Sequence, residues 1–81
     1  METINVKLTG EWVQISDGVM TSDMHVEFGT AQITLSNRKP ADETGSHTMH
    51  KGIWVKIPAP LVAWAKTNLE GSEISISKYV I

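Results

Sequence analysis

The chain of 81 residues contains no cysteine, which excludes a disulfide framework, a thiolate metal site and a thiol nucleophile. Its six glycines stand singly, so no glycine-rich motif is present to cradle the phosphates of a cofactor. Nine acidic and seven basic residues give a net charge of −2, which provides no electrostatic footprint for nucleic acid. No run approaches the roughly 20 apolar residues that cross a bilayer, and the first residues lack the basic and apolar parts of a signal peptide. We therefore expect synthesis in the cytoplasm, no cofactor, and neither nucleic acid nor membrane as partner.

What the chain does contain is a high proportion of β-branched side chains. Seven valines, eight isoleucines and eight threonines stand against four leucines and five alanines, a balance that favours strands over long helices. The length is below that of an average domain, so residues 1–81 are expected to form a single β domain. A core this small, with no disulfides, is commonly supplemented by contacts between subunits.

Apolar and polar residues alternate in about seven runs, and this period of two is typical of half-buried strands. Between two of these runs, the Gly29-Thr30 pair predicts a β-hairpin. Residues 61–67 allow either a strand or two helical turns, and we prefer the strand. The expected fold is all-β, a single small sandwich or barrel of about seven mostly antiparallel strands. The runs cover residues 4–8, 12–16, 24–28, 31–36, 53–57, 61–67 and 74–80.

A long polar loop is predicted at residues 37–52. A loop of this length in a small domain is usually functional or ordered by a neighbour. It contains His47 and His50, which could share a metal ion with help from Asp42 or Glu43. Metal sites need three or four supported ligands, so we prefer hydrated loop histidines and no metal. The two carboxylates have no apolar surroundings to raise a pKa and no nucleophile elbow is present, so we do not expect an enzyme.

Three tryptophans, Trp12, Trp54 and Trp64, are out of step with the aliphatic residues of their own runs. If the aliphatic side chains form the core, the three indoles lie on the outer face of the domain or at its margin. One explanation is that loops of the same chain cover the indoles, and another is that the inward-facing positions of one or two strands are misassigned. The other two explanations are functional: the indoles form a contact surface for another subunit, or a platform on which a sugar stacks.

Several segments together resemble small phage virion proteins, chiefly head decoration or auxiliary proteins with β-sandwich folds. The resemblance implies a non-enzymatic virion protein, present in many copies, that binds a capsid or tail surface and often forms trimers. The Pro58-Ala59-Pro60 interruption departs from the pattern of that group. The segments that carry the resemblance are Trp12-Val13-Gln14-Ile15-Ser16-Asp17-Gly18, Val26-Glu27-Phe28-Gly29-Thr30-Ala31, Ile33-Thr34-Leu35-Ser36-Asn37, Trp64-Ala65-Lys66-Thr67, Gly71-Ser72 and Ile74-Ser75-Ile76-Ser77.

The sequence thus leads us to expect a capsid decoration, or cement, protein that docks on neighbouring capsid subunits and self-associates, preferably as a trimer. Two alternatives stay open: a tail or fibre module that binds a host-surface glycan, and a small intracellular inhibitor that offers an exposed sheet edge to its partner. The interface is expected at the tryptophans and the polar loop. The candidate residues are Trp12, Trp54, Trp64, Arg38, His47 and His50.

Overall fold

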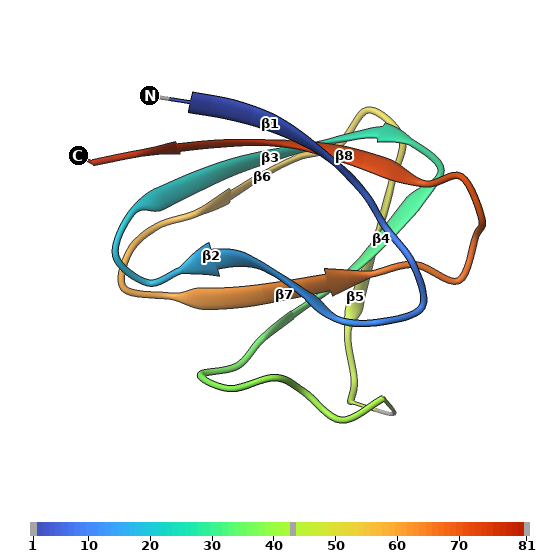
Figure 1. Ribbon diagram of the computed structural model, residues 1–81, viewed down its shortest axis with the longest axis horizontal. Helices are drawn as coiled ribbons and strands as arrows, with labels where there is room; N and C mark the ends of the chain where they lie inside the picture. The colour runs from blue at the N-terminus through green and yellow to red at the C-terminus, as the bar shows by residue number, and fades with distance from the viewer. Residues whose placement is uncertain (1, 43, 81) are drawn as a thin grey trace.

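The structure, a computed structural model, describes residues 2–42 and 44–80. Within these residues the chain forms eight strands and no helix, which confirms the predicted all-β class (Figure 1). Seven strands coincide with the predicted runs, and residues 61–67 contain a strand. The strands are β1 (Glu2–Lys7), β2 (Val13–Asp17), β3 (Thr21–Phe28), β4 (Thr30–Leu35), β5 (His47–His50), β6 (Trp54–Ile57), β7 (Val62–Lys66) and β8 (Glu73–Tyr79).

The strands form two antiparallel sheets of four, packed face to face. The first sheet has the order β1-β8-β3-β6, and the second has the order β2-β7-β4-β5. In Figure 1 the first sheet lies above the second. The two-layer arrangement follows from the alternation in the sequence, because each sheet has one aliphatic face that must be buried against another layer.

The core lies between the two sheets and consists of the aliphatic positions of each strand. Cross-strand register aligns these positions, since Ile76 of β8 is paired with both Ile4 of β1 and Met24 of β3. In the second sheet, Ala65 of β7 is paired with Ile33 of β4. The buried cluster comprises Leu8, Ile15, Met24, Val26, Ala31, Ile33, Ile57, Ala63, Ala65, Ile74 and Ile76.

The predicted hairpin at Gly29-Thr30 is wrong, because β3 belongs to the first sheet and β4 to the second. The chain crosses between the layers at Gly29, whose φ is +72°. A Cβ atom at Gly29 would lie 2.1 Å from the Oγ atom of Ser72, so only glycine fits this crossing. The next amide, that of Thr30, donates to the same oxygen at 3.0 Å. Gly29 and Thr30 therefore pack against Ser72 at the crossing instead of forming the turn of a hairpin.

The prediction of one continuous loop over residues 37–52 is also corrected, because it contains β5. This strand pairs with β4 at the edge of the second sheet, with Met49 opposite Ala31 and His47 opposite Ile33. Among the described strands, β4 and β5 are the one consecutive pair that shares a sheet. The irregular segments between them are residues 36–42 and 44–46, which we call the covering loop.

Candidate functional site

The covering loop folds over the outer face of the second sheet and is fastened there by two indoles. Trp12 Nε1 donates to the carbonyl oxygen of Ala41 at 2.9 Å, and Trp64 Nε1 donates to that of Ser36 at 3.0 Å. Lys66 lies between them: its Nζ atom is 4.6 Å from the Trp12 ring centroid and donates to the Asp42 carbonyl oxygen. The loop runs along the lower side of the molecule in Figure 1.

These contacts change the expected role of two tryptophans. Trp12 and Trp64 lie away from the core, as their phase predicts, but the chain's own loop covers them. Trp12 is only 4% exposed, and Trp64 is half-buried. Trp12 is therefore not part of an accessible contact surface. Of the alternatives considered for the three indoles, coverage by a loop of the same chain applies to Trp12 and Trp64.

The other loop candidates are exposed but do not gather into one site. Arg38 lies in the covering loop, whereas His47 and His50 lie on β5. Because side chains alternate along a strand, residues three apart point to opposite faces, so the two imidazoles are separated. Glu43, considered with Asp42 as a ligand, lies outside the described residues. No group of three or more His, Asp or Glu side chains in the described part of the chain could hold a metal ion.

The outer face of the first sheet, in contrast, is open, and it carries most of the hydrogen bonds that join two side chains in the described part of the chain. Register places on it Thr3, Asn5 and Lys7 of β1, Asp23, His25 and Phe28 of β3, Trp54 and Lys56 of β6, and Glu73, Ser75, Ser77 and Tyr79 of β8. Glu27 joins them through its hydrogen bonds to His25 and Ser75. Each of these side chains is exposed or half-buried. We call this set the open face.

Trp54 is the more exposed of two large apolar side chains on the open face, at 68% against 55% for Phe28 at the end of β3. It is paired across the strands with His25, and the two ring centroids are 4.5 Å apart with the planes inclined at 37°. The indole therefore rests against an imidazole on one side and leaves the rest of its surface to solvent. Of the three tryptophans predicted to face outward, Trp54 is the one that the structure leaves accessible.

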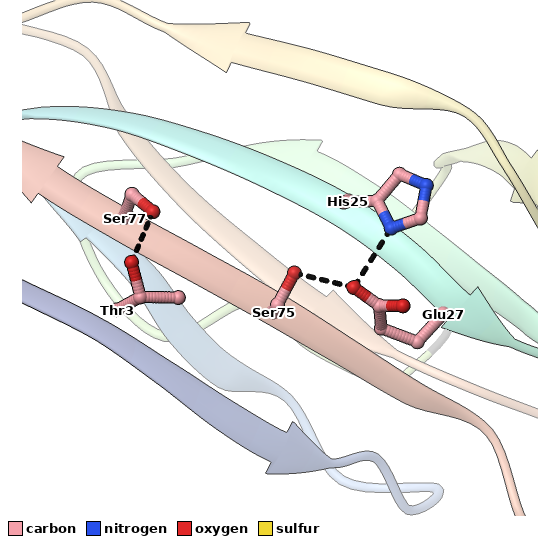
Figure 2. Close-up of polar contacts among 5 residues, drawn as sticks. All are labelled: Thr3, His25, Glu27, Ser75 and Ser77. Carbon is pink, nitrogen blue, oxygen red and sulfur yellow. Dashed lines mark hydrogen bonds and ion pairs between the residues drawn. The ribbon is translucent and has the colours of Figure 1, made fainter.

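Glu27 holds the imidazole of His25 in place. Its Oε1 atom lies 2.8 Å from His25 Nδ1 and accepts a hydrogen bond from Ser75 Oγ, also at 2.8 Å (Figure 2). The hydrogen bond from His25, followed by that from Ser75, lowers the pKa of Glu27 below its ordinary value, so the carboxylate is ionised at neutral pH. An ionised carboxylate at Nδ1 keeps the proton on that nitrogen, which leaves Nε2 of a neutral imidazole as an acceptor.

A serine, a histidine and a carboxylate thus meet on this face, but they are not hydrogen-bonded to one another in the sequence serine–histidine–carboxylate that a nucleophile and its base require. Both Ser75 and His25 are bonded to Glu27. Activation of a serine requires a hydrogen bond from its hydroxyl to the histidine, which would then be oriented by the acid. The observed order instead fixes the side chains in space, as a binding surface requires.

Two further contacts order the same face closer to the chain termini. Tyr79 donates from its hydroxyl to Asp23 Oδ2 at 2.8 Å, and the Thr3 and Ser77 hydroxyls lie 2.7 Å apart (Figure 2 shows the latter pair). The Nζ atom of Lys56 lies 5.8 Å from the Tyr79 ring centroid. Hydrogen bonding with Tyr79 raises the pKa of Lys56 above its ordinary value. Most of the polar side chains are thus held in defined positions.

Sequence reasoning missed His25, Glu27, Asp23 and Tyr79 as members of a site. The first three occupy alternate positions of β3, so a period-two pattern of titratable residues was present in the sequence. The cross-strand register that brings Trp54 beside them could not be read from that pattern.

A second surface lies at the end of the sandwich that carries the chain termini, on the left in Figure 1. Two turns meet there, because a Cβ atom at Gly18 would lie 2.9 Å from the carbonyl oxygen of Pro60. The pairing of Thr21 with Tyr79 brings the residue after Tyr79 alongside the same turns. Three exposed aliphatic side chains of this end are Val19, Leu61 and Val80, at 76%, 41% and 77% exposure. We call these three the apolar end.

A cleft of about 550 Å³ opens between the layers where β4 and β5 face β6. Aliphatic side chains line most of it, including Leu35, Val55, Ile57 and Leu61. The cleft lies mainly on the inner side of the sheets, and it shares Lys56 with the open face and Leu61 with the apolar end.

Comparison with protein-family models, curated proteins and solved structures found no match to this chain. Among the residues that the structure describes, no helix has the length and apolar character needed to span a membrane.

Proposed function

We propose that this chain is a non-catalytic structural protein of a virus particle, of the decoration type, which docks on neighbouring capsid subunits through the apolar end. The observation that carries the proposal is the grouping of Val19, Leu61 and Val80 on turns and a strand end that lie side by side. Aliphatic side chains exposed together at one end of a small domain are typical of a protein contact.

The mechanism is burial of apolar area without chemistry. Each square ångström removed from water contributes about 25 cal/mol, and a standard specific interface covers roughly 800 Å² of each partner. The end of one 81-residue domain is small, so the proposal includes self-association, with a trimer preferred. Three copies that dock together add their contacts, because the second and third bind at a high effective concentration.

The test uses particles that lack the protein and are reconstituted with purified variants. Val19→Ser and Val80→Ser should each reduce the number of bound copies at least about fivefold at limiting concentration, because each places a hydroxyl in an apolar contact. Leu69→Ser is the matched control, since Leu69 is also exposed but lies on the turn at the opposite end. Quantitative mass spectrometry counts the copies, and sedimentation velocity reports the oligomer.

Equal occupancy for all three variants would exclude docking through the apolar end. Absence of the wild-type protein from purified particles would exclude a virion role altogether and favour the intracellular inhibitor.

A further inference from the structure

The open face combines an accessible aromatic surface with a rigid polar surround. Trp54 is supported by His25, which is bonded to Glu27, which in turn is bonded to Ser75. Each of these contacts restricts the rotation of the side chains that it joins before any ligand binds. A ligand that used these groups would therefore bind to a surface already held in position.

The same side chains keep hydrogen-bonding capacity directed to solvent. Within the described residues, both bonds to Glu27 end on Oε1, so Oε2 retains its ability to accept. His25 is bonded through Nδ1, which leaves Nε2 available. Asp23 receives the Tyr79 hydroxyl at Oδ2 and retains Oδ1. Acceptors are thus distributed along β3 beside the indole at intervals of roughly 7 Å, the spacing of alternate residues in a strand.

A sugar ring matches this combination. One side of a pyranose presents C–H groups that pack on an indole, and its rim presents hydroxyls that donate to carboxylate and imidazole acceptors. A protein partner matches it less well, because interface cores are depleted of charged residues and burial would desolvate Asp23, Glu27 and Lys56. An acidic sugar would meet the two carboxylates, which favours a neutral one.

We propose that the open face is a binding site for neutral hexose-containing glycans, in which Trp54 stacks on a pyranose ring while Glu27 and His25 bind its hydroxyls. This activity goes beyond docking on a particle and uses a different surface from the apolar end.

The experiment titrates the isolated 81-residue chain with neutral oligosaccharides of glucose, mannose and galactose, using isothermal titration calorimetry and tryptophan fluorescence. Wild-type protein should bind at least one of them in the micromolar to millimolar range. Trp54→Ala should weaken that binding at least about tenfold, because it removes the stacking surface. Glu27→Gln should weaken it severalfold, because it replaces a charged acceptor by a neutral amide.

Phe28→Ala is the matched control, since Phe28 is an exposed aromatic residue of the same face whose ring contacts Lys51 and is not supported by His25, so its loss should leave sugar binding unchanged. In the Trp54→Ala protein the covered Trp12 and Trp64 report by their emission that the fold is intact. The proposal is refuted if folded wild-type protein binds none of the neutral sugars, or if Trp54→Ala and Phe28→Ala bind equally. It is likewise refuted if Trp54→Ala abolishes attachment to particles while no sugar binds, which would make the open face a protein contact. None of these results depends on Val19 or Val80, so this proposal and the docking proposal can fail separately.

Discussion

Two buried serines should respond in opposite directions to the same substitution. Ser72 Oγ accepts from the Thr30 amide at 3.0 Å, donates to the Leu69 carbonyl oxygen at 2.7 Å, and lies 3.0 Å from the Thr67 hydroxyl. Ser22 is also fully buried, but its Oγ atom has no hydrogen-bond partner among the described residues. Alanine therefore removes a well-connected oxygen in one case and an unpaired one in the other.

The expected magnitudes follow from these partners. Ser72→Ala leaves the Thr30 amide without its acceptor, and an unsatisfied buried group costs about 1–3 kcal/mol. Ser22→Ala removes such a group, so we expect the free energy of unfolding to rise by about 1 kcal/mol. Ser16 makes one bond, from its Oγ to the Leu61 carbonyl oxygen at 3.0 Å, and its alanine variant should lose about 1 kcal/mol. In a domain of this size 1 kcal/mol moves Tm by about 4–8 °C.

Urea unfolding followed by tryptophan fluorescence measures the series, because Trp12 and Trp64 are covered in the native state. The stability order should be Ser22→Ala, wild type, Ser16→Ala and Ser72→Ala, with unchanged slopes against urea. A loss of about 1 kcal/mol or more for Ser22→Ala would show that its hydroxyl is satisfied in solution. An unchanged midpoint for Ser72→Ala would refute the role of Ser72 at the crossing between the sheets.

Three further substitutions test other contacts. Gly29→Ala should destabilise the fold by more than about 2 kcal/mol in the same unfolding assay, because the added Cβ meets Ser72 at a positive φ; a near-neutral result would disprove that crowding. Trp12→Phe removes the hydrogen bond to the Ala41 carbonyl oxygen and should lower the free energy of unfolding by about 1 kcal/mol. Trypsin should then cleave the covering loop faster than in wild type, and an unchanged cleavage rate would contradict the role of this bond. Hydrogen bonds from the Val19 and Met20 amides lower the pKa of Asp17 below 3.8, so its contribution to stability is present above that value and is lost as the pH falls through the lowered pKa. Asp17→Asn keeps the acceptor but does not titrate, so its midpoint should fall less than that of wild type between about pH 4 and pH 2, and parallel curves would exclude this role.

The sequence alone was sufficient to locate the strands that contribute to the core. Ile74 and Ile76 alternate with serines because one face of β8 is buried and the other is not, and the same rule locates seven of the eight strands. The exception, β5, lies at a sheet edge, and Met49 is its single apolar side chain. An edge strand with one inward apolar residue has no alternation to detect, so its pairing with β4 decides its structure.

Which strands pair with one another was harder to predict than where the strands lie in the sequence. The runs on either side of Gly29-Thr30 have hairpin spacing, yet they belong to different layers. Local turn chemistry is satisfied by either arrangement, and the crossing packs against Ser72, which is 43 residues away in the chain from Gly29. Likewise, the covering of Trp12 and Trp64 depends on backbone carbonyl oxygens of the covering loop. Every residue has such an oxygen, so the side chains of the loop gave no signal for these bonds.

The candidate site was predictable only in its aromatic part. The phase of Trp54 against Ile53 and Val55 was enough to place the indole outside the core. His25 and Glu27 acquire their significance from the register of β3 with β6 and β8, which brings them to Trp54 and Ser75. Because that register depends on the packing of the whole sheet, residue types and local spacing could not assign them.

The two proposed surfaces can work in one particle because of where they lie along the strands. The molecule measures 33 × 24 × 15 Å, and the apolar end occupies one extremity of the sandwich (Figure 1). Trp54 begins β6 and the apolar end follows the last residue of that strand, so about 10 Å of strand separates them. The half of the open face that holds Trp54, His25 and Glu27 is thus the half farther from the proposed capsid contact. A domain held by its end would project this half outward, where a glycan of appreciable size could reach the indole without displacing the domain. Particles carrying wild-type protein should therefore bind the sugar recognised by the isolated chain, and Trp54→Ala particles should not, at equal copy number.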